Sequence, residues 1–140
     1  MTRDEAVALL TLREDAFRRA DASGLAATYT VNAVMLSPMF GTVTGREAIE
    51  ASHRKLFTVF KDMVIKTDPL IYENDRGAQS WVGHATHTSE MFGVPASGRP
   101  FEIRGAFVFE FRDGLVAHER RLYDFTGLLL QLGVLKAKPQ

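Results

Sequence analysis

The sequence predicts an α+β protein in which N-terminal helices pack on a curved, mostly antiparallel sheet. Helical periodicity dominates the chain up to about residue 60, and strand alternation dominates residues 63–124. Tight turns connect the strand segments, as in an antiparallel meander, and this order of elements is typical of the α+β class. The 140 residues contain no linker or internal repeat, so we expect a single domain over residues 1–140.

A capping box opens the first predicted helix, because Thr2 and Glu5 have the spacing at which each side chain reaches the other's free backbone N–H. Apolar residues then recur at helical spacing as far as Ala20, and the Asp-Ala-Ser-Gly run at 21–24 ends the helix. Arg13 interrupts the apolar stripe, and we expect its long side chain to extend outward to solvent.

A short helix through Leu25 and Tyr29 and a short strand at 34–36 are expected next. Thr44 and Glu47 repeat the capping-box spacing and therefore predict a further helix. Its apolar face carries Ile49, Leu56, Phe57 and Phe60.

Three or four strands complete the chain, in segments at about 63–72, 78–91, 101–111 and 115–124. The Asp113-Gly114 pair is typical of a two-residue hairpin turn between the last two. One face of the segment 101–111 is apolar and carries Phe101, Ile103, Phe107, Phe109 and Phe111. One mixed face of the last segment, expected to line a pocket or to form a rim of the sheet, carries Val116, His118, Arg120, Leu122 and Asp124.

Composition excludes several classes of function. Lys plus Arg and Asp plus Glu both number 17, so the formal net charge of zero argues against a nucleic acid or an anionic membrane as partner. The absence of cysteine excludes disulfides and thiol catalysis. No run approaches the roughly 20 apolar residues of a membrane span, and no leader pattern opens the sequence, so we expect a soluble, cytoplasmic protein.

Neither a metal nor an organic cofactor is expected. His84 and His87 are three residues apart in a predicted strand, where such residues point to opposite faces and do not bind one ion together. Phosphate-loop, dinucleotide-binding and Gly-x-Ser-x-Gly motifs do not occur.

Asp124 is the most informative single residue, because it lies in an otherwise apolar run between Tyr123 and Phe125. Burial there would raise the pKa of its carboxyl group and make it a candidate acid/base. The alternative is a structural role in which Asp124 caps the helix that follows.

Three segments carry a family resemblance: GHATHTSEMFGVPASGRP at 83–100, GAFVFEFRDGLVAHERRLYD at 105–124, and GLLLQLG at 127–133. The chain resembles the SnoaL-like polyketide cyclases of the nuclear transport factor 2 superfamily. The resemblance implies a cone-shaped fold, also described as an α+β barrel. It also implies that an aspartate at the end of the last strand, here Asp124, is the acid/base.

Two further residues are candidates for acting together with Asp124, and two positions depart from the pattern of the family. Arg120 stands where an aromatic residue is frequent in relatives, and Asn32 stands where many carry an acid. Arg120 is a candidate for holding a substrate oxygen, or else a charged rim residue. His87 is a candidate for orienting substrate, or else a surface or dimer contact.

Eight further residues are candidates for lining a substrate pocket. For the aromatic residues and for His53, an ordinary place in the core is the alternative. The candidates are Phe17, Tyr29, Leu36, Phe40, His53, Trp81, His118 and Leu122.

The expected function is a cofactor-independent, intramolecular aldol ring closure of a hydrophobic, polyketide-like molecule. One alternative is an isomerase or epoxide hydrolase that acts on a steroid-like substrate. Another is a binding module, without catalysis, for a hydrophobic ligand. We also expect a homodimer through the outer sheet face, because helices cover only one side of the sheet.

Overall fold

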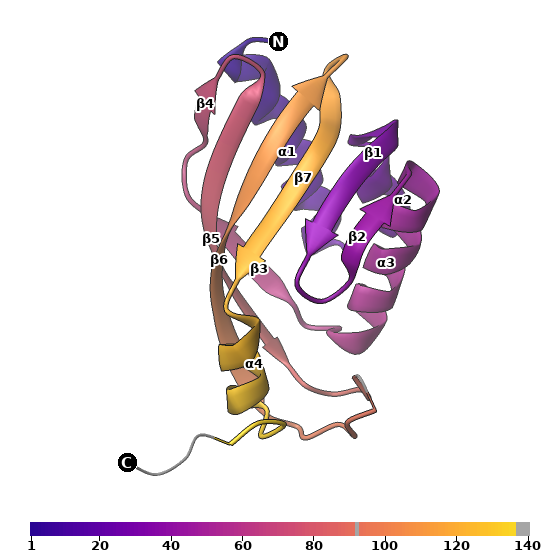
Figure 1. Cartoon of the computed structure of the whole chain (residues 1–140), viewed down its shortest axis with the longest axis vertical. Coiled ribbons are helices and arrows are strands. Elements are labelled where there is room, and N and C mark those ends of the chain that lie inside the picture. The colour runs from indigo at the N-terminus through magenta and orange to yellow at the C-terminus, as the bar shows by residue number, and fades with distance from the viewer. Residues whose placement is uncertain (92, 137–140) are drawn as a thin grey trace.

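The structure, a computed structural model, describes residues 1–91 and 93–136, and in these ranges it has an α+β fold (Figure 1). Its elements are α1 (Arg3–Arg18), α2 (Ala22–Ala26), β1 (Tyr29–Ser37), β2 (Gly41–Thr44), α3 (Arg46–Val59), β3 (Val64–Thr67), β4 (Ile71–Glu73), β5 (Arg76–Thr86), β6 (Pro100–Arg112), β7 (Leu115–Tyr123) and α4 (Phe125–Gln131). Each described helix is too short or too polar to cross a membrane.

The strands form one curved sheet in the order β2-β1-β7-β6-β5-β3, with β4 paired to β5 (Figure 1). Every pairing is antiparallel except the one between β1 and β7, which is parallel. The predicted class, with helices on a curved and mostly antiparallel sheet, is confirmed. The sheet is open, because β2 and β3 form its two ends without pairing to each other in the described chain.

The two predicted capping boxes had different outcomes. Thr2 and Glu5 form one at the start of α1, as predicted. The prediction for Thr44 and Glu47 was wrong, because Thr44 pairs with Val34 as the last residue of β2. The N-cap of α3 is Gly45, whose φ of 93° lies in the left-handed region that favours glycine.

The strand boundaries also differ from the prediction. Tyr29 begins β1 and does not continue a helix, and β2 was missed altogether. The segment 63–72 is two short strands, β3 and β4. These strands lack a regular alternation of apolar residues in the sequence, and their partners lie far away along the chain.

A β-bulge in β7 exchanges the predicted faces in the second half of that strand. Glu110 of β6 pairs with His118, whereas Phe111 pairs with Val116, so Ala117 is an extra residue. Val116 is therefore buried, and after the bulge Glu119 is buried as well. The inner face of β7 beyond the bulge carries Glu119, Arg121 and Tyr123.

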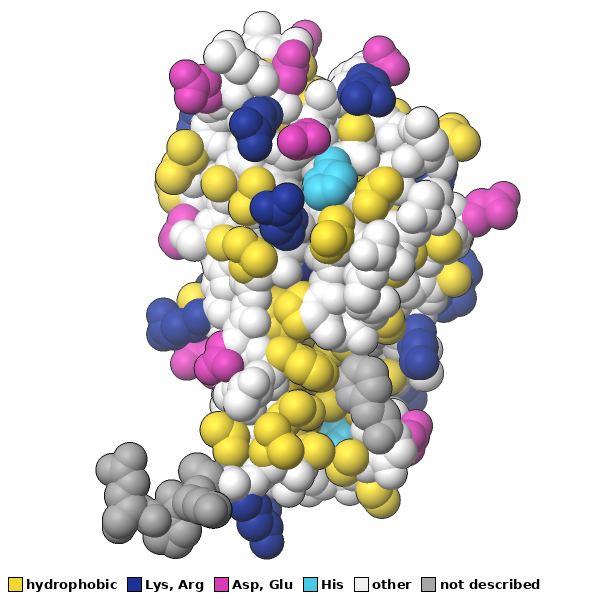
Figure 2. All heavy atoms as spheres, in the orientation of Figure 1, with side chains coloured by type: hydrophobic (Ala, Val, Ile, Leu, Met, Phe, Trp, Pro, Cys, Tyr) yellow, Lys and Arg dark blue, Asp and Glu magenta, His cyan; other side chains and the backbone are white. Residues whose placement is uncertain are grey.

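In the described chain, helices α1, α2 and α3 lie on the inner side of the sheet, and the outer face mixes apolar and charged side chains (Figures 1 and 2). Leu122 on this face is 50% exposed. The homodimer predicted through this face stays a prediction.

Gly105 of β6 lets two strands and the Trp81 ring approach one another. It pairs with Trp81 of β5 and with Tyr123 of β7. A Cβ atom at Gly105 would lie 2.4 Å from the carbonyl oxygen of Leu122 and 2.7 Å from Cζ2 of Trp81, so the backbone or the indole would have to move.

Gly105→Ala is therefore expected to lower the free energy of unfolding by about 1–3 kcal/mol, as overpacking does. It should also shift the fluorescence of Trp81, the only tryptophan in the chain. The matched control is Gly83→Ala, where the nearest atom to an added Cβ is Cζ3 of Trp81 at 3.2 Å and no backbone atom is among the nearest neighbours. Equal losses in urea denaturation would contradict the steric explanation.

Candidate functional site

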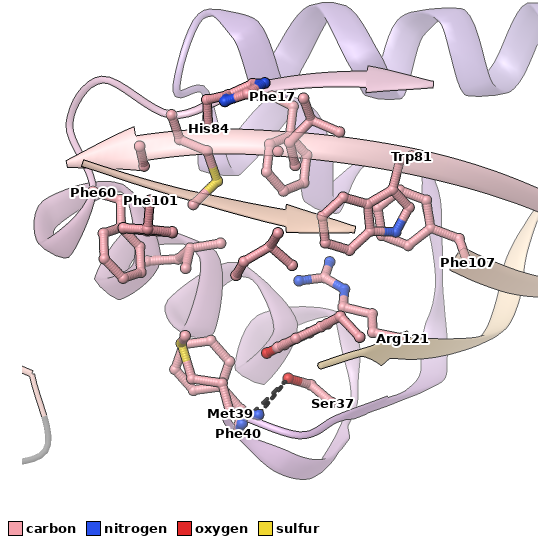
Figure 3. A pocket seen from close by; sticks show the side chains of 17 residues that line it. Phe17, Ser37, Met39, Phe40, Phe60, Trp81, His84, Phe101, Phe107 and Arg121 are labelled. Atoms are coloured by element: carbon pink, nitrogen blue, oxygen red, sulfur yellow. Dashed lines mark hydrogen bonds between the residues drawn. The ribbon is translucent and has the colours of Figure 1, made fainter. Parts of the chain in front are cut away.

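An apolar cavity of about 60 Å³ lies between the helices and the inner face of the sheet (Figure 3). An engineered cavity of about 150 Å³ holds benzene, so a ring-bearing ligand requires the wall to move. Met39 and Met63 are part of that wall, and unbranched methionine side chains adapt readily. The other lining residues are Phe17, Ser37, Phe40, Leu56, Phe60, Ile65, Trp81, Gly83, His84, Ala85, Phe101, Ile103, Phe107, Arg121 and Tyr123.

The polar groups of this cavity are mostly hydrogen-bond donors. Figure 3 shows the Arg121 guanidinium extending toward the Trp81 side of the cavity. Nε1 of Trp81 is buried and has no hydrogen-bond partner among the described residues. The Oγ atom of Ser37 accepts hydrogen bonds from the backbone N–H groups of Met39 and Phe40 at 3.1 and 3.2 Å (Figure 3). Burial raises the pKa of Tyr123, so its phenol is neutral at physiological pH.

Behind Arg121 lies a buried ion cluster centred on the carboxylate of Glu119. Nη2 of Arg13, on α1, donates to Oε1 of Glu119 at 2.9 Å. Nε of Arg121 donates to Oε2, and the hydroxyl of Tyr29 donates to Oε1. All four side chains are nearly or completely inaccessible to solvent. The cluster therefore joins α1, β1 and β7 at the base of the cavity.

His53 of α3 belongs to the same cluster. Its Nδ1 lies 2.8 Å from the carbonyl oxygen of Ile49, which can only accept a hydrogen bond, so Nδ1 carries the proton. Nε2 is then the acceptor for the Nη2 group of Arg121. Burial, reinforced by the charge of Arg121, holds the pKa of His53 well below its usual value, and the ring is neutral.

The charges of the cluster set the ionisation of Glu119. Burial alone would raise the pKa of Glu119, but Arg121 and Arg13 outweigh it and hold the pKa at about 2. Burial alone would lower the pKa of Arg121, and Glu119 outweighs it and raises that pKa. Both groups are therefore charged across the physiological range.

Stability is expected to fall as pH decreases from 7. The pKa of His53 lies lower in the fold than the ordinary 6.5, so its contribution is present above pH 6.5 and is lost as pH falls below it. The contribution of Glu119 is lost between about pH 4.5 and pH 2. Urea midpoints between pH 7 and pH 5 should decline less in His53→Gln than in the parent. His84→Gln, at a half-exposed histidine, is the control, and an equal decline in all three would contradict the role of His53.

Asp124 does not lie in the cavity. It is exposed and is the N-cap of α4, where its Oδ1 accepts a hydrogen bond from the N–H of Gly127 at 2.8 Å. The prediction that Asp124 is buried at the inner end of a pocket was wrong. After the bulge in β7, the inner face carries Glu119, Arg121 and Tyr123, and Asp124 is not on it.

Asp124→Ala is expected to lower the free energy of unfolding by about 0.5–2 kcal/mol through loss of the cap. Asp124→Asn keeps a capping side chain and should leave stability close to that of the parent. Denaturation in urea checks both variants. If Asp124→Asn is as damaging as Asp124→Ala, the carboxylate charge has a role beyond capping.

The other two predicted catalytic residues also lie outside the cavity. Arg120 is exposed on the outer face of the sheet. His87 is fully buried in the turn after β5, where its Nδ1 accepts from the N–H of Ser97 at 3.2 Å. His87 therefore stabilises the loop between β5 and β6 by its hydrogen bond to Ser97.

The predicted pocket-lining residues fall into three groups. Phe17, Phe40 and Trp81 line the cavity, and their role in binding a substrate stays a prediction. Tyr29 and His53 lie behind it in the ion cluster. The outer sheet face holds the remaining three, Leu36, His118 and Leu122.

Sequence reasoning missed Glu119, Arg121 and Tyr123, and it placed Arg13 wrongly. Arg13 is 2% exposed, because it forms an ion pair with Glu119 and does not extend to solvent. A signal was present in α1, where Arg13 lies four residues from both Leu9 and Phe17 in the buried stripe. A charge at such a position indicates a buried counter-charge.

The helices on an open, curved sheet give the chain a fold of the nuclear transport factor 2-like class, shared with an NTF2-like protein of unknown function from Burkholderia pseudomallei at 18% identity, with 94% and 98% covered and a TM-score of 0.79. Within that class, the model of the SnoaL-like polyketide cyclases matches residues 7–132. The chain belongs to this family. A search of curated proteins found no match. Among the described residues, no group of three His, Asp or Glu side chains is placed to hold a metal ion.

Several solved structures share the fold of this chain. TsrD from Streptomyces laurentii is 25% identical, with 96% of this chain and 99% of TsrD covered and a TM-score of 0.85. IdmH from Streptomyces antibioticus, described as a putative polyketide cyclase, is 25% identical, with 91% and 97% covered and a TM-score of 0.77. AclR from Streptomyces galilaeus, described as a putative hydroxylase, shares the fold at 24% identity, with 99% and 91% covered and a TM-score of 0.84.

Proposed function

We propose that the protein binds a hydrophobic, polyketide-like carbonyl compound in the cavity and promotes its intramolecular aldol ring closure. The observation that carries this proposal is a guanidinium, that of Arg121, in a mostly apolar cavity that Trp81, with its unpaired Nε1–H group, also lines. Fixed donors in a site that excludes water stabilise developing negative charge strongly. Membership of the cyclase family supports the same class of reaction.

In this mechanism a carbon between two carbonyl groups loses a proton, and the resulting enolate carbon attacks a second carbonyl of the same molecule. Arg121 and Trp81 stabilise the enolate oxygen, and the neutral phenol of Tyr123 donates a proton to the new alkoxide and regains one from water. The apolar wall holds the reacting carbons close together.

In this proposal the proton on carbon passes to solvent water before the substrate is enclosed in the cavity. Among the described residues that line the cavity there is no Asp or Glu. Glu119 lies nearby, but a carboxylate with a pKa of about 2 and two guanidinium partners is a weak base. The contribution of the protein is therefore electrostatic stabilisation and positioning.

The absence of Asp and Glu from the described lining of the cavity favours a second candidate function, a binding module that holds the ligand without transforming it. The two functions differ in whether enolate formation is accelerated.

Hydrogen–deuterium exchange at the central carbon of acetylacetone, followed by NMR, tests the proposal. This small β-diketone forms an enolate by loss of that proton, and exchange is expected to be faster with the folded protein than with buffer or with unfolded protein. A change in Trp81 fluorescence without faster exchange supports the binding module. Neither a fluorescence change nor faster exchange would contradict both functions.

A further inference from the structure

The buried cluster behind the cavity carries more positive than negative charge. Arg13 and Arg121 contribute two positive charges and Glu119 one negative charge, a net of +1 from 2 − 1, and these side chains are 2%, 6% and 0% exposed. His53 adds no charge, because its Nδ1 donates and its Nε2 accepts. Tyr29 is a neutral phenol whose pKa burial raises further.

No neighbouring carboxylate balances this charge among the described residues. Glu14 is next to Arg13 in sequence, but its carboxylate accepts a hydrogen bond from Thr67 and lies 3.4 Å from Nε2 of Gln79. Asp15 pairs with Arg18 and Arg19 at the surface.

The groups around the cluster either add positive charge or stabilise the cations without neutralising them. Arg46 lies partly buried against the carbonyl oxygen of Tyr29, with its Nε at 2.9 Å. The guanidinium carbon of Arg13 lies 4.4 Å from the centre of the Phe107 ring, and that of Arg121 lies 5.9 Å from it. Cation–π contacts stabilise a buried cation without neutralising it.

We propose that the cavity takes its ligand as an organic anion, with one carboxylate, phenolate or enolate oxygen against Arg121 and Nε1 of Trp81. A buried charge without a counter-charge is unfavourable, so an anion that completes the cluster binds better than a neutral molecule of the same shape. Nε1 of Trp81 is a second, independent observation in favour of an anionic ligand, because it is a buried donor with no acceptor in the described chain. The inference rests on the proposed function, since it assumes that the cavity is the ligand site.

The inference also accounts for the absence of a carboxylate base in the described lining. A site that favours the anion lowers the pKa of a bound β-dicarbonyl compound. Such a compound enters or persists as its enolate, and the proton goes to solvent water. The cavity then selects the enolate by its negative charge, and no side chain has to remove the proton from carbon.

The test compares benzoate with benzamide, two single-ring probes of nearly the same shape, at pH 7, where a carboxylate is ionised. Trp81 lines the cavity and is the only tryptophan, so its fluorescence reports occupancy. Benzoate is expected to bind at least roughly tenfold more tightly, the factor expected for a hydrogen bond to a charged group. Equal binding overturns the anion inference and leaves the proposed function standing. Failure of both probes to bind overturns the proposed function and the inference with it.

Arg121→Met should remove the preference for benzoate and leave the binding of benzamide within about threefold. Arg104→Met removes one positive charge from an exposed position on β6 and should keep the preference of the parent. If both variants lose the preference for benzoate equally, general surface charge explains that preference and the inference is overturned. Circular dichroism checks that the variants fold. If Arg121→Met does not fold, the ratio of the benzoate and benzamide affinities of the parent protein tests the inference by itself.

Discussion

Replacing Glu119 with leucine is expected to lower the free energy of unfolding by about 3–5 kcal/mol, which is the typical effect of removing one partner of a buried ion pair. The variant leaves Arg13 and Arg121 inside the protein without their shared counter-charge. It also leaves the hydroxyl of Tyr29 without its acceptor. Because domains of this kind are stable by only about 5–15 kcal/mol, the variant should be close to unfolding at physiological temperature.

Denaturation in urea, followed by the fluorescence of Trp81 and by circular dichroism, measures this loss. The matched control is Glu102→Leu on β6, where the carboxylate is 45% exposed and its pairs with His84 and Arg104 are 3.6 Å long. That variant should change stability by less than about 0.5 kcal/mol. A loss below about 1 kcal/mol for Glu119→Leu would contradict the central place of Glu119 in the core.

Replacing Arg121 with methionine is expected to slow the exchange of acetylacetone by roughly 100-fold, in line with the loss of one donor from a site that stabilises an oxyanion. Methionine fills a similar volume without charge or N–H groups, so the apolar wall is kept. Arg121→Lys keeps the charge but loses the planar guanidinium, and its rate should fall between those of the parent and Arg121→Met.

The rate of Arg104→Met is the reference for this series, because that residue is 74% exposed on the outer face. Exchange at the parental rate in a folded Arg121→Met protein would exclude Arg121 from the chemistry. The same data would then favour the binding module.

Local signals in the sequence were sufficient for the first helix and for the long strands. The capping box of Thr2 and Glu5, the apolar stripe of α1 and the Asp113-Gly114 turn all depend on residues a few positions apart. The alternation of phenylalanines in β6 likewise predicted which of its faces is buried. These features determine the fold class, and the class was predicted correctly.

The candidate site depends on contacts that no local pattern contains. The bulge at Ala117 exists only in the pairing of β7 with β6, and it exchanges the inner and outer faces of the strand's second half. A sequence reading that counts in steps of two therefore selected Arg120 and Asp124, whereas Glu119 and Arg121 face inward. Arg13 and Glu119 are 106 residues apart, so the partner that permits burial of each is not visible from its own neighbourhood.

The central position of β7 has a consequence for biosynthesis. This strand lies between β1 and β6 and is the only strand that links the β1–β2 pair to the rest of the described sheet. Tyr29 and Glu119, which meet across that junction, are separated by 90 residues. During translation the edge of β1 that pairs with β7, and the side chain of Arg13, therefore lack these partners until β7 has left the ribosome. Until then the edge of β1 presents unpaired backbone groups, which are open to pairing with another chain.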